Sequence, residues 1–163
     1  MRSDLLGWPD VGHGLLEELR VERGRFVLIA ADGPIASDRL AERLRADIGV
    51  CVVSLGQALT ALPQPPTTNE IDAACADAMV LTDIDLLFWP VMRVPVLEFL
   101  ANRSRQRPTI AVWPGEITGR RATYSTPGLP DHHDVTLRDV IVLRPRDTRF
   151  PDEVPFEIER ILP

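Results

Sequence analysis

The chain has 163 residues, 45% of them hydrophobic, which is enough for one domain with a buried core. Its formal net charge of −6 argues against general affinity for nucleic acid. No apolar run approaches the roughly 20 residues that a membrane span needs. The opening MRSDLLGWPD contains no apolar signal segment, so the sequence predicts a cytoplasmic protein without a membrane contact.

Helical and strand patterns alternate along the chain. Five apolar runs predict strands at residues 26–30, 50–55, 78–84, 109–113 and 139–144, and helical patterns lie at 11–23, 35–48, 67–77 and 95–106. Thr67 and Glu70 have the spacing of a capping box. The strand runs are continuously apolar, as expected of parallel strands that are covered on both faces. The order predicts an open α/β sheet with right-handed crossovers.

One domain over residues 1–163 accounts for the whole pattern. It would consist of an N-terminal helical segment at 1–24, an α/β core at 25–144 and a Pro-rich tail at 145–163. We expect the tail to be extended and then to form one short turn. Phe156, Ile161 and Leu162 would dock it on the body or on a partner.

The first strand, its loop and the next helix have the layout of a phosphate-binding P-loop, which reads GxxxxGK[ST]. The equivalent residues here are AADGPIAS, Ala30 to Ser37, so Gly33 and Ser37 are the nucleotide-binding candidates. Ala36 replaces the lysine, and because all 18 basic residues are arginine, no lysine elsewhere can substitute for it. A lost charge-assisted hydrogen bond costs roughly 1.5–3 kcal/mol.

Two further residues of this loop oppose phosphate binding. Pro34 has no backbone N–H to donate, and Asp32 brings negative charge to the place where a phosphate would sit. The alternative interpretation is a turn that caps its own helix, with Asp32 and Asp38 at the positive helix end. The sequence favours this second interpretation, so we expect no cofactor, and ATP with Mg²⁺ only if the degenerate site is still competent.

The third strand resembles a Walker-B strand, an apolar run that ends in acid. Asp83 and Asp85 are the catalytic candidates, since one carboxylate would organise Mg²⁺ and the next would polarise the attacking water. Thr82 stands where the first acid is usual. Acids at i and i+2 share a side of an extended chain, so both could face one site. A solubilising strand end with a helix-capping acid is the equally weighted alternative.

The connection 114–134 predicts a small hairpin, ITGRRATY, that turns near Gly119 and Arg120. Tyr124 and the arginines are candidates for a partner or ligand contact. His132 and His133 are flanked by acids, but neighbouring side chains of an extended loop point apart, so we predict no metal site. Cys51 and Cys75 also lack metal spacing and are expected to be buried, reduced thiols.

Arginine clusters provide a possible partner or nucleic-acid contact surface. Its candidate residues are Arg103, Arg105, Arg107, Arg120 and Arg121. The acidity of the chain makes direct nucleic-acid binding the weakest of the functional hypotheses.

Four segments together resemble the BrxF family, the small P-loop proteins of type 3 BREX (bacteriophage exclusion) defence systems. They are the strand–loop–helix at 26–44, VLTDIDLLF at 80–88, FLANRSRQRPTIAVWPG at 99–115 and RATYSTPGLPDHHD at 121–134. The resemblance covers about residues 12–145. It implies a P-loop NTPase-like three-layer sandwich whose five-stranded, mainly parallel sheet has helices on both faces. It also implies defence-system partners, namely a large ATPase, a phosphatase-like protein and a DNA methyltransferase.

The departures at Ile35, Ala36 and Thr82 from the family's motifs favour a protein without hydrolytic activity. We therefore expect a degenerate P-loop ATPase-like accessory subunit that acts by protein–protein contact, pairing with partners or with a second copy. The alternatives are a weak ATP-binding ATPase that uses Ser37, Asp83 and Asp85, with Arg39 in place of the lysine, and a nucleic-acid-binding module.

Overall fold

The computed structural model describes residues 7–31, 33–62, 65–147, 149–150 and 153–163, leaving aside the side chains of 33–37. The main sheet has six strands in the order β2-β3-β4-β1-β8-β9. They are β1 (Phe26–Ala30), β2 (Val52–Ser54), β3 (Val80–Thr82), β4 (Ile110–Trp113), β8 (Val140–Pro145) and β9 (Phe156–Ile161). The first five are mutually parallel, and β9 is antiparallel to β8.

The five parallel strands are those that the apolar runs predict. Alternate residues of β1 point to opposite faces, so Phe26 and Leu28 enter one core while Val27 and Ile29 enter the other. All four are 0–3% exposed, which explains why the run is continuously apolar. The mixed, mostly parallel sheet with helices confirms the predicted α/β class.

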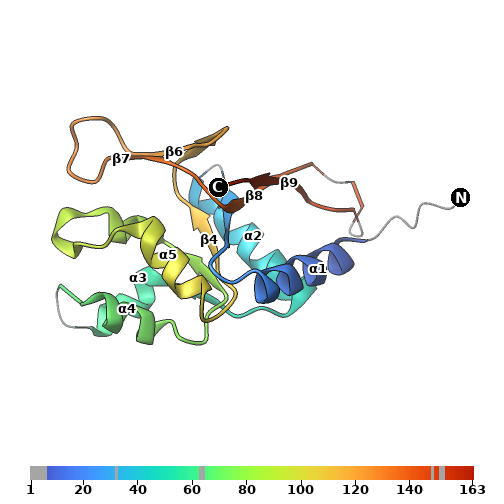
Figure 1. Ribbon diagram of the computed structural model, residues 1–163, viewed down its shortest axis with the longest axis horizontal. Helices are drawn as coiled ribbons and strands as arrows, with labels where there is room; N and C mark the ends of the chain where they lie inside the picture. The colour runs from blue at the N-terminus through green and yellow to red at the C-terminus, as the bar shows by residue number, and fades with distance from the viewer. Residues whose placement is uncertain (1–6, 32, 63–64, 148, 151–152) are drawn as a thin grey trace, which may run out of the picture.

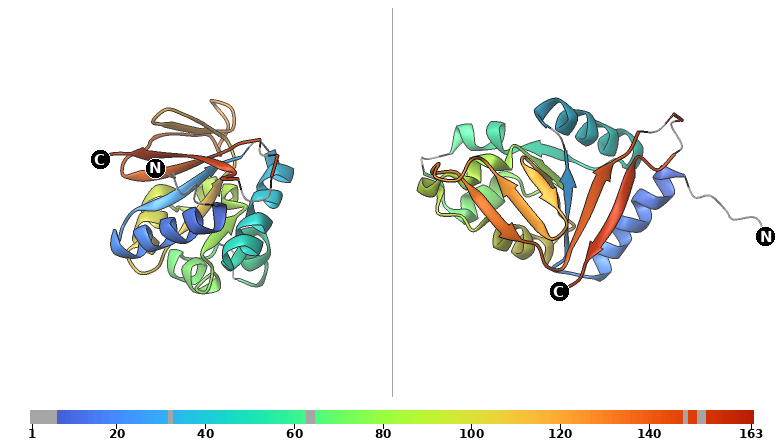
Figure 2. Two further views of the ribbon diagram at one scale, coloured as in Figure 1. Left: turned by 90° about the vertical axis from the view of Figure 1, so that its right-hand side faces the viewer. Right: turned by 90° about the horizontal axis from the view of Figure 1, so that it is seen from above.

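Helices cover both faces of the main sheet (Figures 1 and 2). On one face lie α1 (Trp8–Val21) and α2 (Gly33–Ile48), and on the other lie α3 (Leu55–Ala58), α4 (Thr68–Ala74) and α5 (Val96–Ser104). Short 3₁₀ turns complete the second layer at η1 (Leu59–Ala61), η2 (Ile84–Phe88) and η3 (Pro90–Met92). Each longer helix buries an apolar stripe, such as Leu15, Leu16 and Leu19 of α1.

The predicted capping box of α4 is present. The Thr67 hydroxyl accepts from the Glu70 N–H at 3.2 Å, and the Glu70 carboxylate accepts from the Thr67 N–H at 2.7 Å. Both bonds satisfy donors that a helix start leaves free, so α4 begins at the residue after Thr67.

A second, three-stranded antiparallel sheet lies beside α5 and was only partly predicted. It contains β5 (Glu116–Thr118), β6 (Arg121–Tyr124) and β7 (His133–Thr136). The expected hairpin is the β5–β6 pair, and β7 adds a strand that the loop-like 125–134 sequence did not indicate. Ile117, Ala122 and Leu137 are buried in the core that α3, α4 and α5 also cover, so this face is not covered by helices alone.

The C-terminal tail differs from the expected short turn. Residues 156–161 form β9 instead, paired with β8 from Val140↔Ile161 to Pro145↔Phe156. Phe156 and Ile161 are buried as predicted, but Leu162 is 67% exposed. The tail reaches the first helix, where the Arg160 guanidinium donates to Glu18 at 2.7 and 2.9 Å and the Phe156 ring lies 5.1 Å from that of Trp8.

Two smaller findings complete the fold. Across the described residues, no helix has the length and apolarity to cross a membrane. Cys75 is buried as expected, whereas Cys51 is exposed because it stands just before the edge strand β2.

Candidate functional site

The carboxyl ends of the parallel strands are the natural place to look for a ligand site. From β1 the chain crosses through α2 to β2, and from β4 it crosses to β8 on the other side of β1. Neighbouring strands β1 and β4 therefore send the chain in opposite directions, and ligands of open α/β sheets bind in the crevice at such a switch point. Ala31 and Trp113, which follow and end these two strands, are 2% and 0% exposed.

The P-loop-like segment is mostly helical. β1 ends at Ala30 and α2 begins at Gly33, so the last five of the eight motif residues belong to the helix. A phosphate-cradling loop instead needs a run of non-helical residues whose N–H groups wrap the ligand. Asp32 and the side chain of Ser37 lie outside what the structure describes, so the predicted roles of Gly33 and Ser37 in nucleotide binding stay predictions.

The two candidate carboxylates do not lie on one extended strand. β3 ends at Thr82, Asp83 takes a left-handed conformation (φ 56°), and Asp85 lies in η2. The expectation that both acids share a strand side was wrong, because it assumed extended backbone as far as residue 85. Thr82, at the position of the usual Walker-B acid, is 6% exposed.

Asp83 already has a partner within the chain. The Ser54 hydroxyl donates to its carboxylate at 2.5 Å, and the same hydroxyl oxygen accepts from the Gln57 N–H at 3.4 Å. The side chain that caps α3 is therefore that of Ser54, and Asp83 holds this hydroxyl in place. Asp83 itself begins η2 without a side-chain cap bond, so it is not the helix-capping acid of the alternative interpretation. Sequence reasoning missed Ser54, although its place at the end of β2, next to β3, was a usable signal.

Asp85 lies near Tyr124 of the small sheet. Burial raises the pKa of Asp85 above its ordinary value of 3.8, and the charges of Asp83 and Asp131 act in the same direction, while the nearby Tyr124 hydroxyl opposes them. Burial also raises the pKa of Tyr124, and the Asp85 charge acts in the same direction. The predicted contact of Tyr124 with a partner or ligand stays a prediction.

The substitution Asp85→Asn is expected to stabilise the protein at pH 7. Because the pKa of Asp85 is higher in the folded than in the unfolded state, ionisation lowers stability as the pH rises from 3.8 to the folded-state value, and the full cost is present above it. Thermal melts should show the stability gain of the variant at neutral pH and its loss below pH 3.8, where Asp85 is protonated in both states. Asp77→Asn on an exposed turn is the control and should change stability by no more than about 0.5 kcal/mol. A gain that persists at low pH would contradict the assignment.

An aromatic cluster pins the small sheet to η2. The Phe88 ring lies 5.1 Å from Trp113, 4.8 Å from Tyr124 and 4.3 Å, stacked, from His133. His132 contacts the Tyr124 carbonyl through Nδ1 at 3.1 Å. The two histidines thus have separate packing roles. Within the described ranges no group of three His, Cys, Asp or Glu side chains could hold a metal ion.

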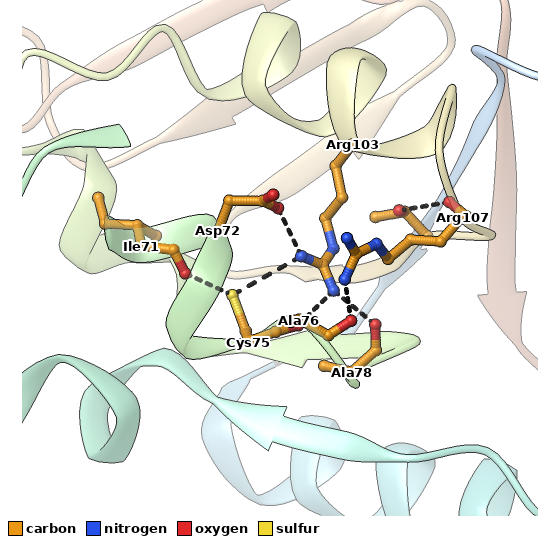
Figure 3. A network of polar contacts seen from close by, with 8 residues as sticks. Ile71, Asp72, Cys75, Ala76, Ala78, Arg103 and Arg107 are labelled. Carbon is orange, nitrogen blue, oxygen red and sulfur yellow. Dashed lines mark hydrogen bonds and ion pairs between the residues drawn. The ribbon is translucent and has the colours of Figure 1, made fainter. Parts of the chain in front are cut away.

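Two of the five arginines of the predicted contact surface, Arg103 and Arg107, bond to groups within the chain. Arg103 is 3% exposed and binds Asp72 and the carbonyls of Cys75 and Ala78, so its predicted role as a contact for a partner or nucleic acid was wrong (Figure 3). Arg107 donates to the Ala76 carbonyl in the same turn.

The other candidate arginines lie on two segments, the end of α5 and the β5–β6 hairpin. Arg105 is exposed at the end of α5 and lies against Gly24. Arg120 donates to the Leu162 carbonyl at 2.5 Å, and Arg121 pairs with Asp134, which lowers the pKa of that carboxyl through their hydrogen bond. The five arginines therefore do not form one continuous cationic face.

An apolar groove lies next to the candidate acids. It has a volume of about 270 Å³ and is lined by Gly56, Leu59, Thr60, Leu86, Trp89, Val91 and Met92. Trp89 is 47% and Val91 62% exposed. Large apolar side chains gathered at a surface hollow are typical of a contact surface.

Comparisons with protein-family models, curated proteins and solved structures give no match to this chain.

Proposed function

We propose that this chain is a P-loop NTPase-like accessory subunit of a bacterial anti-phage, BREX-type defence system, and that it binds protein partners without hydrolysing ATP. The observation that carries the proposal is the start of α2 at Gly33 in a chain that has no lysine. A triphosphate at this edge would lack both the wrapping loop and the ammonium that neutralise it in P-loop enzymes.

Two further observations support the same proposal. Of the two carboxylates that would organise Mg²⁺ and water, Asp83 already accepts from the Ser54 hydroxyl, and Asp85 lies in η2 beyond the end of β3, where burial disfavours its charge. The groove beside Trp89 presents apolar side chains that a partner would remove from water. The resemblance to the BrxF family supplies the partner classes: a large ATPase, a phosphatase-like protein and a DNA methyltransferase. A cytoplasmic location and pairing with a second copy belong to the proposal as well.

Calorimetry and an affinity measurement on the purified chain test the proposal. Titration with ATP and Mg²⁺ should give no saturable heat, and the chain should not hydrolyse ATP. Its affinity for the large ATPase, the phosphatase-like protein and the methyltransferase of a type 3 system should be measured with each alone. For the partner that binds, Trp89→Ala should weaken the Kd by about tenfold or more, since buried tryptophans dominate interface energies.

Val21→Ala is the matched control for the affinity measurement. Val21 is 74% exposed on α1, on the opposite layer, and its truncation should leave the Kd unchanged. ATP hydrolysis above trace rate that Ser37→Ala abolishes would disprove the non-hydrolysing role. If the chain bound none of the three partners, the assignment to such a complex would be disproved.

A further inference from the structure

A second hollow lies near the amino ends of the parallel strands, whereas the P-loop-like segment lies at the carboxyl end of β1. The hollow has a volume of about 220 Å³ and is lined by Leu19, Arg20 and Arg23 at the end of α1 and by Ser104, Gln106 and Arg107 at the end of α5. These two helices lead into the amino ends of β1 and β4 (Figure 1). The hollow therefore lies near the amino ends of these two strands. We call it the arginine pocket.

The guanidinium groups of this pocket have unused donor capacity. Over the described part of the chain, Arg23 forms neither a hydrogen bond nor an ion pair. Arg20 pairs with Glu17 at 3.3 Å, with both side chains more than half exposed, and such surface pairs are weak. Arg107 uses Nη1 for the Ala76 carbonyl, which leaves its other N–H groups.

The neighbouring acids do not cancel this positive charge. Glu18 and Glu22 are paired with Arg25, and Glu18 also with Arg160, so of the three acids near the end of α1 only Glu17 faces Arg20. Arg105 adds a further guanidinium beside Gly24. A positive charge near a helix C-terminus also interacts favourably with the helix dipole, without any ligand. Arg23 lies two residues beyond the end of α1 and, in the described part of the chain, donates to no carbonyl, so its N–H groups remain available to a ligand.

The chemistry of the pocket favours a small oxyanion. Guanidinium groups match phosphate with two parallel N–H bonds, which the point charge of lysine does not provide. A volume of about 220 Å³ is below the roughly 300–1,000 Å³ of drug-sized ligand sites. The net charge of −6 repels long polyanions, while Leu19 and Pro108 offer apolar surface to a small organic group.

We propose that the arginine pocket binds a phosphate group, either inorganic phosphate or a small phosphate monoester. The site is independent of the P-loop-like edge, and it goes beyond the proposed function. Because the two sites lie at opposite ends of the parallel strands, substitutions in one leave the other in place.

Calorimetry with inorganic phosphate, phenyl phosphate and a single-stranded oligonucleotide tests this site. The unsubstituted chain should bind phosphate or phenyl phosphate saturably. The double variant Arg20→Gln with Arg23→Gln should lose at least about tenfold in affinity. Arg138→Gln paired with Arg146→Gln is the control, because both side chains are exposed and it changes the net charge equally. The control should keep the affinity, and tighter binding of phenyl phosphate would identify an ester ligand.

Three results would overturn the proposal. They are the absence of saturable phosphate binding, an equal loss of affinity in the control, and an oligonucleotide affinity that exceeds that of phenyl phosphate and is lost in the same double variant. Ser37→Ala separates this site from the other edge. Phosphate binding that falls with Ser37→Ala and not with the arginine variants would place the ligand at the P-loop-like segment, and would count against both proposals.

Discussion

Replacing Arg103 with methionine is expected to lower the free energy of unfolding by about 3–5 kcal/mol, the usual cost of removing one partner from a buried ion pair. The Arg103 guanidinium donates to Asp72 Oδ1 at 2.7 Å, to the Ala78 carbonyl at 2.6 Å and to the Cys75 carbonyl (Figure 3). Its side chain is 1% exposed. Methionine fills a similar volume but donates to none of these acceptors, and the Cys75 carbonyl keeps only the Ala78 N–H at 3.0 Å.

Arg105→Met is the matched control for Arg103→Met. Arg105 stands two residues later at the end of α5, is exposed, and should tolerate the change within about 0.5 kcal/mol. Urea unfolding followed by circular dichroism measures both variants. Arg103→Lys should recover only part of the loss, because an ammonium cannot span acceptors that a planar fork reaches. Equal stabilities of the Arg103 and Arg105 variants would contradict the role of the buried guanidinium.

Gly115→Ala is expected to destabilise the protein by about 3 kcal/mol or more, at or above the upper end of ordinary overpacking. A methyl group at Gly115 would lie 1.9 Å from the Thr123 carbonyl oxygen, which is backbone and cannot rotate away. The same oxygen accepts from Trp113 Nε1 at 3.0 Å. Relief of the clash would therefore displace β6 and weaken the indole bond that holds it.

Gly14→Ala provides the opposite result as a control. A methyl group at Gly14 meets nothing within 4 Å on α1, so this variant should gain about 0.5–1 kcal/mol from helix propensity. Thermal melts and near-ultraviolet circular dichroism, which reports the tryptophan environment, compare the two. A Gly115→Ala variant with unchanged stability and tryptophan signal would show that β6 can move at little cost.

Local signals were sufficient to predict the parallel part of the fold. The apolar runs, the capping box at Thr67 and the β5–β6 turn near Gly119 each depend on residues close together in sequence. β9 was missed because its region is rich in proline and its partners are distant. The alternation of Phe156 and Ile158 with polar residues was a strand signal. β7 had no comparable signal, since it is stabilised by pairing with β6 and by the stacking of His133 on Phe88.

The candidate site was harder to predict than the fold. Asp83 and Asp85 were expected to share one side of an extended strand, but the left-handed turn at Asp83 ends that strand, and Asp83 bonds to Ser54 while Asp85 lies in η2. The arginine cluster of α5 was interpreted from its charge, whereas burial decides the role of Arg103. Side chains that form hydrogen bonds over 25 to 31 residues, as Arg103 does, depend on tertiary geometry that composition does not show.

The ion pair between Glu18 and Arg160 joins residues 142 positions apart. Closing a loop of that length carries an entropic cost that must be met before the contact contributes any stability, and contacts of this kind slow folding. During synthesis, the apolar side of α1 would face an incomplete sheet until β9 had left the ribosome. We therefore expect the native state to be completed only after β9 has been synthesised, and chains truncated before residue 156 to be the species most prone to aggregate.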